Sequence, residues 1–290
     1  MKRIFLTGGE GLLGSRIVQI EGYETLATCF ENVELVGKRF VFLDIRRKQD
    51  VFNAVSAWAP DAVIHAAALT NVDYCEEHPR DAEEINAFGT ANVAEAAERV
   101  GAKMVYVSTD YVFDGEKGMY CEDDEPKPIN TYAKTKLQGE EWVKRICSNY
   151  AIARTSVLYG WSKNKLNYAS WLVGELEASR SVNIVVDQWA SPTLADNLAD
   201  ALLFVCNRDL KGFYHIAGSD RASRFEFAQK LAEAFGFDKN LIRAVSSSEI
   251  GWKAKRPPDS SLNISKIQRE GFKMLNVGEG LSRMKETRGK

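Results

Sequence analysis

Four residues in one stretch of this chain could together transfer a proton. Thr109 and Asp110 closely follow the apolar run 104–107, which predicts a buried strand. Tyr132 and Lys136 are four residues apart in a helical pattern, so they share one helix face. A lysine ammonium beside a phenol favours the phenolate and lowers the tyrosine pKa from about 10 towards neutrality. The pattern therefore predicts a tyrosine that acts as a general acid or base.

The same Tyr-x-x-x-Lys spacing also occurs as an ordinary pair on amphipathic helices, so the interpretation depends on the N-terminus of the chain. Residues 3–7 predict a strand, and a helical pattern follows to about Ile20. Glycines at the junction allow a tight turn and a close approach of the backbone to a pyrophosphate. We therefore expect a dinucleotide to contact Gly8, Glu10, Gly11, Leu12, Leu13 and Gly14.

The end of the second expected strand, 24–28, should distinguish the two nicotinamide cofactors. An acidic residue at this position binds the adenosine ribose of NAD. Cys29 takes the position where that acid would stand, Glu31 could still reach the ribose, and neither residue is the arginine that would mark NADP. The cofactor is therefore NADPH or NADH, and the missing acid favours NADPH.

Later strand ends add further expected cofactor contacts. Residues 40–43 and 62–66 predict two more strands, and alanines at the end of the second would let a flat cofactor lie against the backbone. The expected contacts are Asp44, Ile45, Ala66, Ala67, Ala68 and Ser108, together with Tyr132 and Lys136.

Two polar residues in this half have both a structural and a functional interpretation. His65 lies between an apolar strand and alanines, so a structural histidine is favoured over a catalytic base. Asn86 falls on the inner side of the expected helix 81–100, where a buried amide needs partners. It would fix a water or a backbone carbonyl near Tyr132, or else lie on the helix surface.

The alternation of strands and helices through residue 155 predicts an α/β fold with a doubly wound parallel sheet of the Rossmann type. We expect an NAD(P)-binding domain at 1–156 and a smaller, mixed substrate-binding lobe at 157–290. A strand and helix at about 183–206 are expected to return to the first domain.

Composition excludes several classes of protein. The 290 residues carry a net charge of −2, which does not favour nucleic acid or an anionic membrane as a partner. The five scattered cysteines have neither metal nor disulfide spacing and indicate reduced thiols in a cytoplasmic protein. No apolar stretch reaches membrane-spanning length, and no metal site is expected.

Fuller sequence strings identify a family. STDYVFDG, INTYAKTKLQGE, RTSVLYG, VVDQWASPT, YHIAGS and KRPPDSSLN, together with the glycines and the Tyr/Lys pair, resemble the dTDP-4-dehydrorhamnose reductase family of the extended short-chain dehydrogenase/reductase superfamily over essentially the whole chain. The resemblance implies NAD(P)H-dependent reduction of the 4-keto group of a nucleotide-linked 6-deoxy sugar, and it leaves a homodimer open.

The resemblance also implies a role for each residue of the site. Tyr132 would donate the proton, Lys136 would hold the nicotinamide ribose and lower the pKa of Tyr132, and Thr109 would hydrogen-bond the C4 oxygen of the substrate. Asp110 and Tyr111 would line the sugar pocket. Separately, Arg256 beside Pro257 is a candidate phosphate contact, with an ordinary surface turn as an equal alternative.

Two positions separate this chain from its apparent relatives. Related 4,6-dehydratases carry a glutamate base where this chain has Tyr111, which argues against dehydration. Many rhamnose-pathway reductases carry a tryptophan that packs on the sugar where this chain has Val157, so the sugar is not fixed by the resemblance. A second class of function stays open, because the regulatory β subunit of methionine adenosyltransferase resembles the same motifs.

Overall fold

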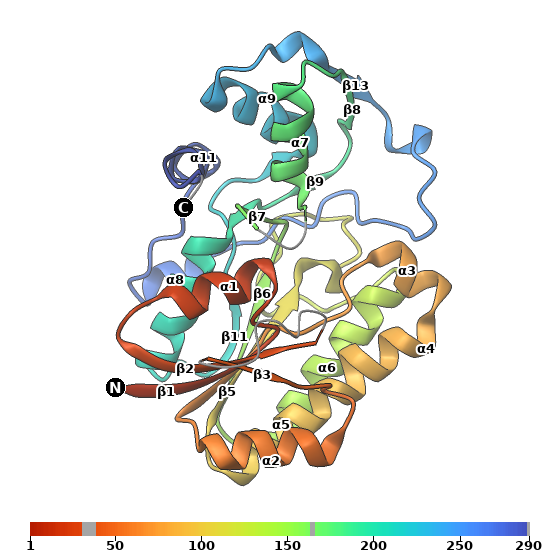
Figure 1. Cartoon of the computed structure of the whole chain (residues 1–290). Coiled ribbons are helices and arrows are strands. Elements are labelled where there is room, and N and C mark those ends of the chain that lie inside the picture. Colours follow the sequence, from red (N-terminus) through yellow and green to blue (C-terminus); the bar gives the residue numbers. More distant parts are fainter. Residues whose placement is uncertain (31–38, 163–165, 289–290) are drawn as a thin grey trace.

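A seven-stranded, entirely parallel sheet forms the centre of the molecule (Figure 1). The computed structural model describes all residues except 31–38, 163–165 and 289–290. The strands lie in the order β11-β6-β5-β4-β1-β2-β3 and are β1 (Lys2–Thr7), β2 (Tyr23–Cys29), β3 (Phe40–Phe42), β4 (Ala62–His65), β5 (Lys103–Thr109), β6 (Tyr150–Thr155) and β11 (Gly212–His215). The expected doubly wound parallel sheet is confirmed.

Helices cover both faces of this sheet. Along β1, Ile4 and Leu6 point to one face and Phe5 to the other, so the strand is apolar at successive positions. One face packs on α1 (Leu12–Gln19), α8 (Ala195–Asn207) and α10 (Ser265–Arg269). The other packs on α2 (Lys48–Trp58), α5 (Thr90–Arg99) and α6 (Thr131–Ile146).

The strand order reverses between β1 and β4. The chain runs outward from β1 to β3, then returns to β4 and continues through β5 and β6 on the other side. Open parallel sheets bind ligands in the crevice at the carboxyl ends of the strands where the order reverses. The residues expected to bind the cofactor and the substrate lie at carboxyl ends of these strands. They are the glycine loop (residues 8–14), the alanine loop (residues 66–68) and Thr109.

The long helix expected at 81–100 is present in the structure and contains a π-helical turn. The connection from β4 to β5 contains α3 (Val72–Glu77), α4 (Pro79–Ala82), a π-helical turn at Glu83–Gly89 and then α5. A π-helical turn shifts the side chains that follow it relative to a regular helix and is common at functional sites. Asn86 lies within this turn and is buried.

The C-terminal part has its own apolar core beyond the carboxyl edge of the sheet (Figure 1). It contains α7 (Tyr168–Glu177), α9 (Arg224–Phe235) and α11 (Val277–Glu286). Three two-stranded sheets complete it: β7 (Leu158–Tyr159) with β10 (Thr193–Leu194), β9 (Trp189–Ala190) with β12 (Ala222–Ser223), and β8 (Val182–Val185) with β13 (Ile242–Val245). Short 3-10 turns lie at Asp110–Val112, Lys239–Leu241 and Ser247–Glu249.

One expectation about this part is wrong. The strand expected at about 183 does not return to the central sheet, because β8 pairs with β13 inside the C-terminal part. Helix α8 does lie against α1, and the strand that joins the central sheet is β11, beside β6. An apolar run predicts a strand but not its pairing partner. The division of the chain at residue 156 stays a prediction.

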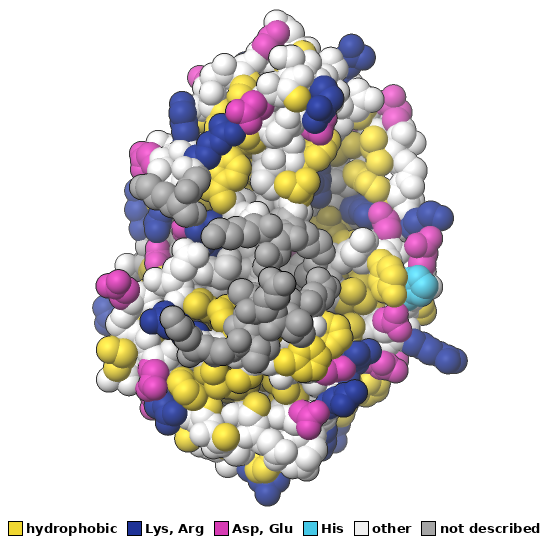
Figure 2. Space-filling view, viewed as in Figure 1, with side chains coloured by type: hydrophobic (Ala, Val, Ile, Leu, Met, Phe, Trp, Pro, Cys, Tyr) yellow, Lys and Arg dark blue, Asp and Glu magenta, His cyan; other side chains and the backbone are white. Residues whose placement is uncertain are grey.

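The surface carries mixed charge. On the face in Figure 2, basic and acidic side chains are interspersed over both parts of the molecule, in keeping with the net charge of −2. Within the described ranges, no helix is long and apolar enough to cross a bilayer, and no group of three or more His, Cys, Asp or Glu residues is arranged to hold a metal ion.

Candidate active site

Helix α6 is fixed at its N-terminus, next to the tyrosine expected to act as acid. The Asn130 side chain caps the helix by accepting from the Ala133 N–H at 2.9 Å. Glu76, on α3, accepts from the Thr131 N–H at 2.9 Å. These two acceptors satisfy amides of the first turn, so the position of Tyr132 is set by both its own helix and α3.

Tyr132 meets the strand end as the sequence predicts. Burial raises the pKa of its phenol, a hydrogen bond with Thr109 opposes that rise, and the charge of Asp110 adds to it. The ring of Tyr111 stands edge-on to the Tyr132 ring, with 6.2 Å between centroids. Burial is the largest of these effects, so the pKa of Tyr132 is raised overall, and the expected stabilisation of the phenolate by Lys136 stays a prediction. A raised pKa keeps the phenol protonated, which is the form a general acid needs.

Lys136 is buried below Tyr132 and is held by the strand rather than by the phenol. Its Nζ donates to the carbonyl of Val107 at 2.8 Å and lies 4.2 Å from the centre of the Tyr106 ring. Burial lowers the pKa of Lys136 to about 7, and the carboxylate of Glu140 opposes that shift. Its charge is therefore sensitive to small changes near neutral pH.

A buried ion pair supports α6 from beneath. Arg154 on β6 donates to both carboxylate oxygens of Glu140, at 2.9 and 2.7 Å, and both side chains are almost fully buried. The Ser108 hydroxyl donates to the same carboxylate at 2.5 Å. The Ser108 hydroxyl therefore faces the ion pair inside the protein, and the expected contact between Ser108 and the cofactor stays a prediction.

Asp110 joins three segments instead of lining the sugar pocket. Its carboxylate accepts from the hydroxyls of Thr109 at 3.1 Å, Ser156 at 2.7 Å and Ser260. Burial raises the pKa of Asp110 to about 6, and these hydrogen bonds oppose the rise. Its expected role as a wall of the pocket is thus corrected: it ties β5, the end of β6 and the loop before α10 to one another.

The glycine loop provides a cradle for a ligand. Gly8 has φ +73°, a conformation that favours glycine. A Cβ at Gly14 would lie 2.6 Å from the Cα of Gly9, and one at Gly9 would lie 2.5 Å from the Cβ of Ala27. A Cβ at Gly11 would meet only the Gly8 carbonyl, at 3.3 Å. Gly8, Gly9 and Gly14 are therefore needed for packing, whereas Gly11 is exposed and a Cβ there would be close to a single backbone oxygen. The sequence pattern did not identify Gly9.

The start of α1 suits the pyrophosphate of a dinucleotide. Gly11 holds the N-cap position and has no side chain to accept from the amides of the first turn, where Leu12 and Leu13 stand. Amides at a helix N-terminus, with the positive end of the helix dipole, favour an anion. Gly11 leaves this end of the helix open, so the loop fits the cofactor expected from the sequence.

A chain of hydrogen bonds holds the alanine loop next to the glycines. The Thr90 hydroxyl donates to the Asn86 carbonyl at 2.7 Å, so its oxygen accepts from Nε2–H of His65 at 3.0 Å. Nδ1 of His65 then accepts from the Thr7 hydroxyl at 2.6 Å, and Thr7 accepts from the Ala67 N–H at 3.2 Å. Burial lowers the pKa of His65 to about 3. The prediction of a neutral, structural histidine is confirmed.

Asn86 closes the same loop from the other side. Its amide accepts from the Leu69 N–H at 2.8 Å and donates to the Leu69 carbonyl at 3.0 Å. It also donates to the hydroxyl of Thr135 on α6, at 3.2 Å. Of the two interpretations, the structure supports the buried amide that fixes a backbone carbonyl. The loop containing Ala66 and Ala68 is thus held against both β1 and α6.

The adenosine end of the expected site is less open than the sequence suggests. Asp44 accepts a bidentate contact from Arg46, which lowers the pKa of its carboxyl group, and the side chain of Ile45 is buried in the core. Cys29 is buried at the end of β2. The carboxylate of Glu10 accepts from the N–H of Phe30 at 2.7 Å. Glu31 lies outside the described residues.

A small cavity lies on the sugar side, beyond Tyr132. It is lined by Tyr111, Val157, Gln188, Trp189, Ala190, Arg224, Pro257 and Ser260. Val157 has φ +37°, a strained conformation for a β-branched residue and one that occurs preferentially at functional sites. A larger cavity, of about 480 Å³, lies between β3 and α2 and shares only Asp44 with the expected site.

Arg256 is not directed into this cavity as a free cation. Its two terminal nitrogens donate to the two carboxylate oxygens of Asp73, at 2.6 and 2.8 Å. Asp73 also accepts from the N–H groups of Lys253 and Ala254, at 2.9 Å each. The structure therefore favours an anchoring role for Arg256, in which it holds the loop that carries Pro257. Its expected phosphate contact loses support because the guanidinium is already paired.

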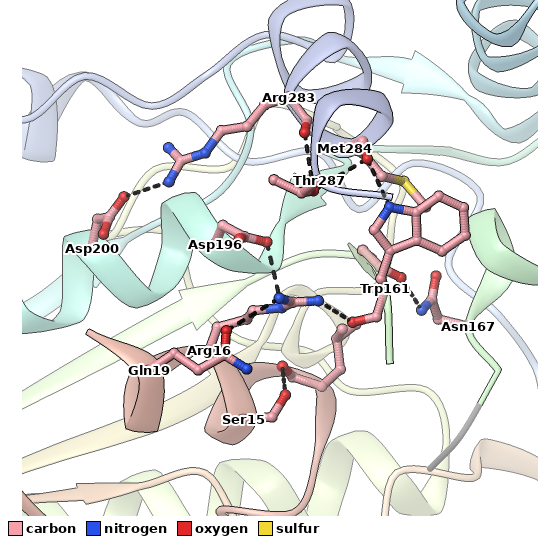
Figure 3. A network of polar contacts seen from close by, with 12 residues as sticks. Ser15, Arg16, Gln19, Trp161, Asn167, Asp196, Asp200, Arg283, Met284 and Thr287 are labelled. Atoms are coloured by element: carbon pink, nitrogen blue, oxygen red, sulfur yellow. Dashed lines mark hydrogen bonds and ion pairs between the residues drawn. The ribbon is translucent and has the colours of Figure 1, made fainter. Parts of the chain in front are cut away.

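The C-terminal part is attached to the helix of the glycine loop through Arg16 (Figure 3). Arg16 on α1 donates to the Trp161 carbonyl at 2.6 Å and lies 3.7 Å from the carboxylate of Asp196 on α8. The Trp161 indole donates to the Met284 carbonyl on α11 at 2.7 Å. The segment that runs on from Val157 is thus linked to the helix expected to bind the cofactor.

Comparison with known proteins agrees with this geometry. The family model described as RmlD substrate binding domain matches residues 1–288. The crystal structure of dTDP-4-dehydrorhamnose reductase from Bacillus anthracis in complex with NADP is 34% identical, covers 98% of this chain and 99% of its own, and superposes with a TM-score of 0.87.

Two curated relatives have different names. The dTDP-4-dehydrorhamnose reductase of Sinorhizobium fredii is 32% identical over 253 residues, which cover 83% of this chain and 85% of that enzyme. Methionine adenosyltransferase 2 subunit beta of Xenopus tropicalis is 30% identical over 278 residues, which cover 93% of this chain and 83% of that subunit. Sequence similarity alone therefore does not separate the two functions.

Proposed function

This chain belongs to the RmlD substrate binding domain family, and from that membership and the site around Tyr132 we propose that it is an NAD(P)H-dependent reductase of the 4-keto group of a nucleotide-linked 6-deoxy sugar. The reaction is that of a dTDP-4-dehydrorhamnose reductase, which forms dTDP-L-rhamnose. The observation that carries the proposal is the position of Tyr132 in the first turn of α6, with Lys136 one turn further along the same helix and Thr109 at the carboxyl end of β5 within hydrogen-bonding reach of the phenol.

The residues of the site divide the work of the reduction between them. NAD(P)H supplies the hydride when bound at the glycine loop. The phenol of Tyr132 donates the proton to the C4 oxygen of the sugar, and the Thr109 hydroxyl orients that oxygen. The ammonium of Lys136, directly below, stabilises the phenolate left on Tyr132 and would bind the nicotinamide ribose.

Tyr111 supports reduction over dehydration. Burial raises the pKa of its phenol, so the residue stays protonated at neutral pH. A protonated phenol cannot remove the C5 proton, as the glutamate base of the related dehydratases does. Reduction at C4 needs no such base, and the site contains one acid in position to serve it, Tyr132.

NADPH is the proposed cofactor over NADH, because a cysteine holds the position at the end of β2 where an acid would bind the adenosine ribose of NAD. Cys29 stands where NAD enzymes carry an acid, and burial raises the pKa of its thiol, which is therefore neutral. The glycine loop serves either cofactor equally. A homodimer and a boundary between two domains at residue 156 remain predictions.

A regulatory function is the alternative, favoured by the similarity to methionine adenosyltransferase 2 subunit beta. Retention of Thr109, Tyr132 and Lys136 in a connected arrangement supports catalysis, since a purely regulatory subunit has no need of the proton donor. The deciding assay follows NAD(P)H oxidation on addition of dTDP-4-keto-6-deoxyglucose epimerised at C3 and C5. Turnover supports the reductase. If no turnover occurs and the protein binds stably to a methionine adenosyltransferase, the reductase function is refuted and the regulatory function is supported.

A further inference from the structure

Arg224 lines the cavity on the sugar side, and two other arginines lie next to lining residues, since Arg256 precedes Pro257 and Arg221 lies over the ring of Trp189. These two are already paired with carboxylates. Arg256 is bound by Asp73 through both terminal nitrogens. Arg221 is paired with Asp259 at 2.7 Å. Such pairs are largely neutralised, so neither arginine offers a full charge to an incoming anion.

Arg224 differs from the other two. It lines the cavity at the first residue of α9 and is half-buried. Its Nε donates to the side-chain carbonyl of Gln188 at 3.0 Å, and its guanidinium lies 5.4 Å from the centre of the Tyr168 ring. In the part of the chain that the structure describes, no carboxylate is paired with Arg224. A half-buried cation with only neutral neighbours is a place where an anion gains free energy.

The described contacts of the Arg224 guanidinium are all with neutral side chains. Gln188 takes the Nε–H and the Tyr168 ring lies beside the group. Tyr111 lines the same cavity, and its hydroxyl lies within hydrogen-bonding reach of the guanidinium. The terminal nitrogens are thus the groups that can meet an oxygen-rich anion in the bidentate geometry that arginine prefers for phosphate.

Arg224 is connected to the proton donor Tyr132 through Tyr111. Tyr132 and Tyr111 are in edge-on contact, and Arg224 reaches the hydroxyl of Tyr111. The three side chains therefore follow one another from the proton donor to the cavity wall. In a nucleotide sugar, one pyranose ring separates C4 from the carbon that carries the diphosphate.

We propose that Arg224 binds the diphosphate of the nucleotide sugar and so sets the distance at which C4 meets Tyr132. This rests on the proposed function, since it assigns one end of that substrate. The sugar ring then lies between Tyr111 and Val157, and the nucleoside lies beyond Arg224, towards α7. The sequence did not single out Arg224, because only the structure shows which of the three arginines have a carboxylate partner.

The test compares Arg224→Gln with Arg224→Lys, with Arg221→Gln as the matched control. A charge-assisted hydrogen bond contributes roughly 10- to 100-fold in affinity, so Arg224→Gln should weaken dTDP binding and raise the KM for the keto sugar by about that factor. Arg224→Lys should recover part of both losses, because it restores the charge but not the bidentate geometry. Arg221→Gln should change neither constant appreciably. NADPH affinity should stay at the parental value in all three variants.

The readouts separate this proposal from the function on which it rests. If Arg224→Gln loses dTDP binding and the parent reduces no keto sugar, the anion site is supported and the reductase function is refuted. If the parent is active and Arg224→Gln keeps the parental dTDP affinity and KM, the anion site is refuted and the reductase function is supported. A parent that does not bind dTDP, or an equal loss in Arg221→Gln, would also overturn the proposal. Thermal unfolding identifies any variant that fails to fold. If Arg224→Gln fails to fold, the test is dTDP binding to Arg224→Lys measured over a range of salt concentrations.

Discussion

Gly11 and Gly14 should respond to substitution in opposite ways, although both belong to the same glycine pattern. A Cβ at Gly11 would meet only the Gly8 carbonyl at 3.3 Å, and its backbone (φ −72°, ψ 171°) suits any residue. A Cβ at Gly14 would lie 2.6 Å from the Cα of Gly9 and 2.9 Å from the carbonyl carbon of Gly8. The first substitution therefore adds bulk outside the fold, and the second adds it within the fold.

The size of each effect follows from these contacts. Gly11→Val should cost about 1 kcal/mol or less in stability, the usual effect of losing a favourable N-cap residue. Its side chain would cover the amides of the first turn of α1. Losing two charge-assisted hydrogen bonds at roughly 1.5–3 kcal/mol each corresponds to about 10²- to 10⁴-fold weaker NADPH binding. Gly14→Ala should cost about 1–3 kcal/mol or more in stability, because the overlapping atoms belong to the backbone.

Calorimetric titration with NADPH and thermal unfolding of the parent and both variants measure the two effects separately. The expected pattern is a folded Gly11→Val that binds NADPH weakly and a destabilised Gly14→Ala. Parental affinity in Gly11→Val would refute the assignment of the loop. Loss of stability in Gly11→Val equal to that in Gly14→Ala would refute the claim that a side chain at Gly11 lies outside the packed fold.

Three further predictions concern the residues beneath the site. Lys136→Met should weaken NADPH binding and turnover together, and any residual alcohol oxidation should shift to higher pH, which steady-state kinetics in both directions would show. Glu140→Gln should lower the urea-derived free energy of unfolding by about 3–5 kcal/mol, since it leaves the buried charge of Arg154 without its partner. The control Glu175→Gln, in an exposed pair, should leave that free energy almost unchanged. The pKa of Asp110 in the folded protein, about 6, exceeds its ordinary value of 3.8, so the folded state binds the proton more tightly than the unfolded state. The free energy of unfolding should therefore fall by up to about 3 kcal/mol as pH rises from about 4 to about 6. Asp110→Asn should remove this dependence on pH.

The sequence predicted those parts of the site that depend on local spacing. Tyr132 and Lys136 share a helix face because a helix has 3.6 residues per turn, and Thr109 follows a strand whose apolar run is evident. Glycines at a strand-to-helix junction likewise have a local meaning. These features needed no knowledge of distant contacts.

What the sequence could not supply were partners far apart in the chain. Arg256 meets Asp73, 183 positions away, and that pairing removes it as a free phosphate ligand. Strand β8 has the composition of a sheet strand, yet its partner is β13 and not the central sheet. The net rise in the pKa of Tyr132 could not be predicted, because burial, which depends on the whole fold, is the largest influence on the pKa values of both Tyr132 and Lys136. Charge and burial at a site are properties of tertiary structure.

The most direct test of the account is the turnover of Tyr132→Phe with NADPH and the dTDP-linked 4-keto sugar, measured beside its cofactor affinity. The substitution removes the transferable proton and leaves the ring and its contact with Tyr111. General acid catalysis typically contributes about 10² to 10⁴ in rate, so kcat should fall at least about 10²-fold while NADPH affinity stays at the parental value. A variant that keeps parental kcat would contradict the assignment of Tyr132 as the proton donor, and with it the mechanism derived from the site.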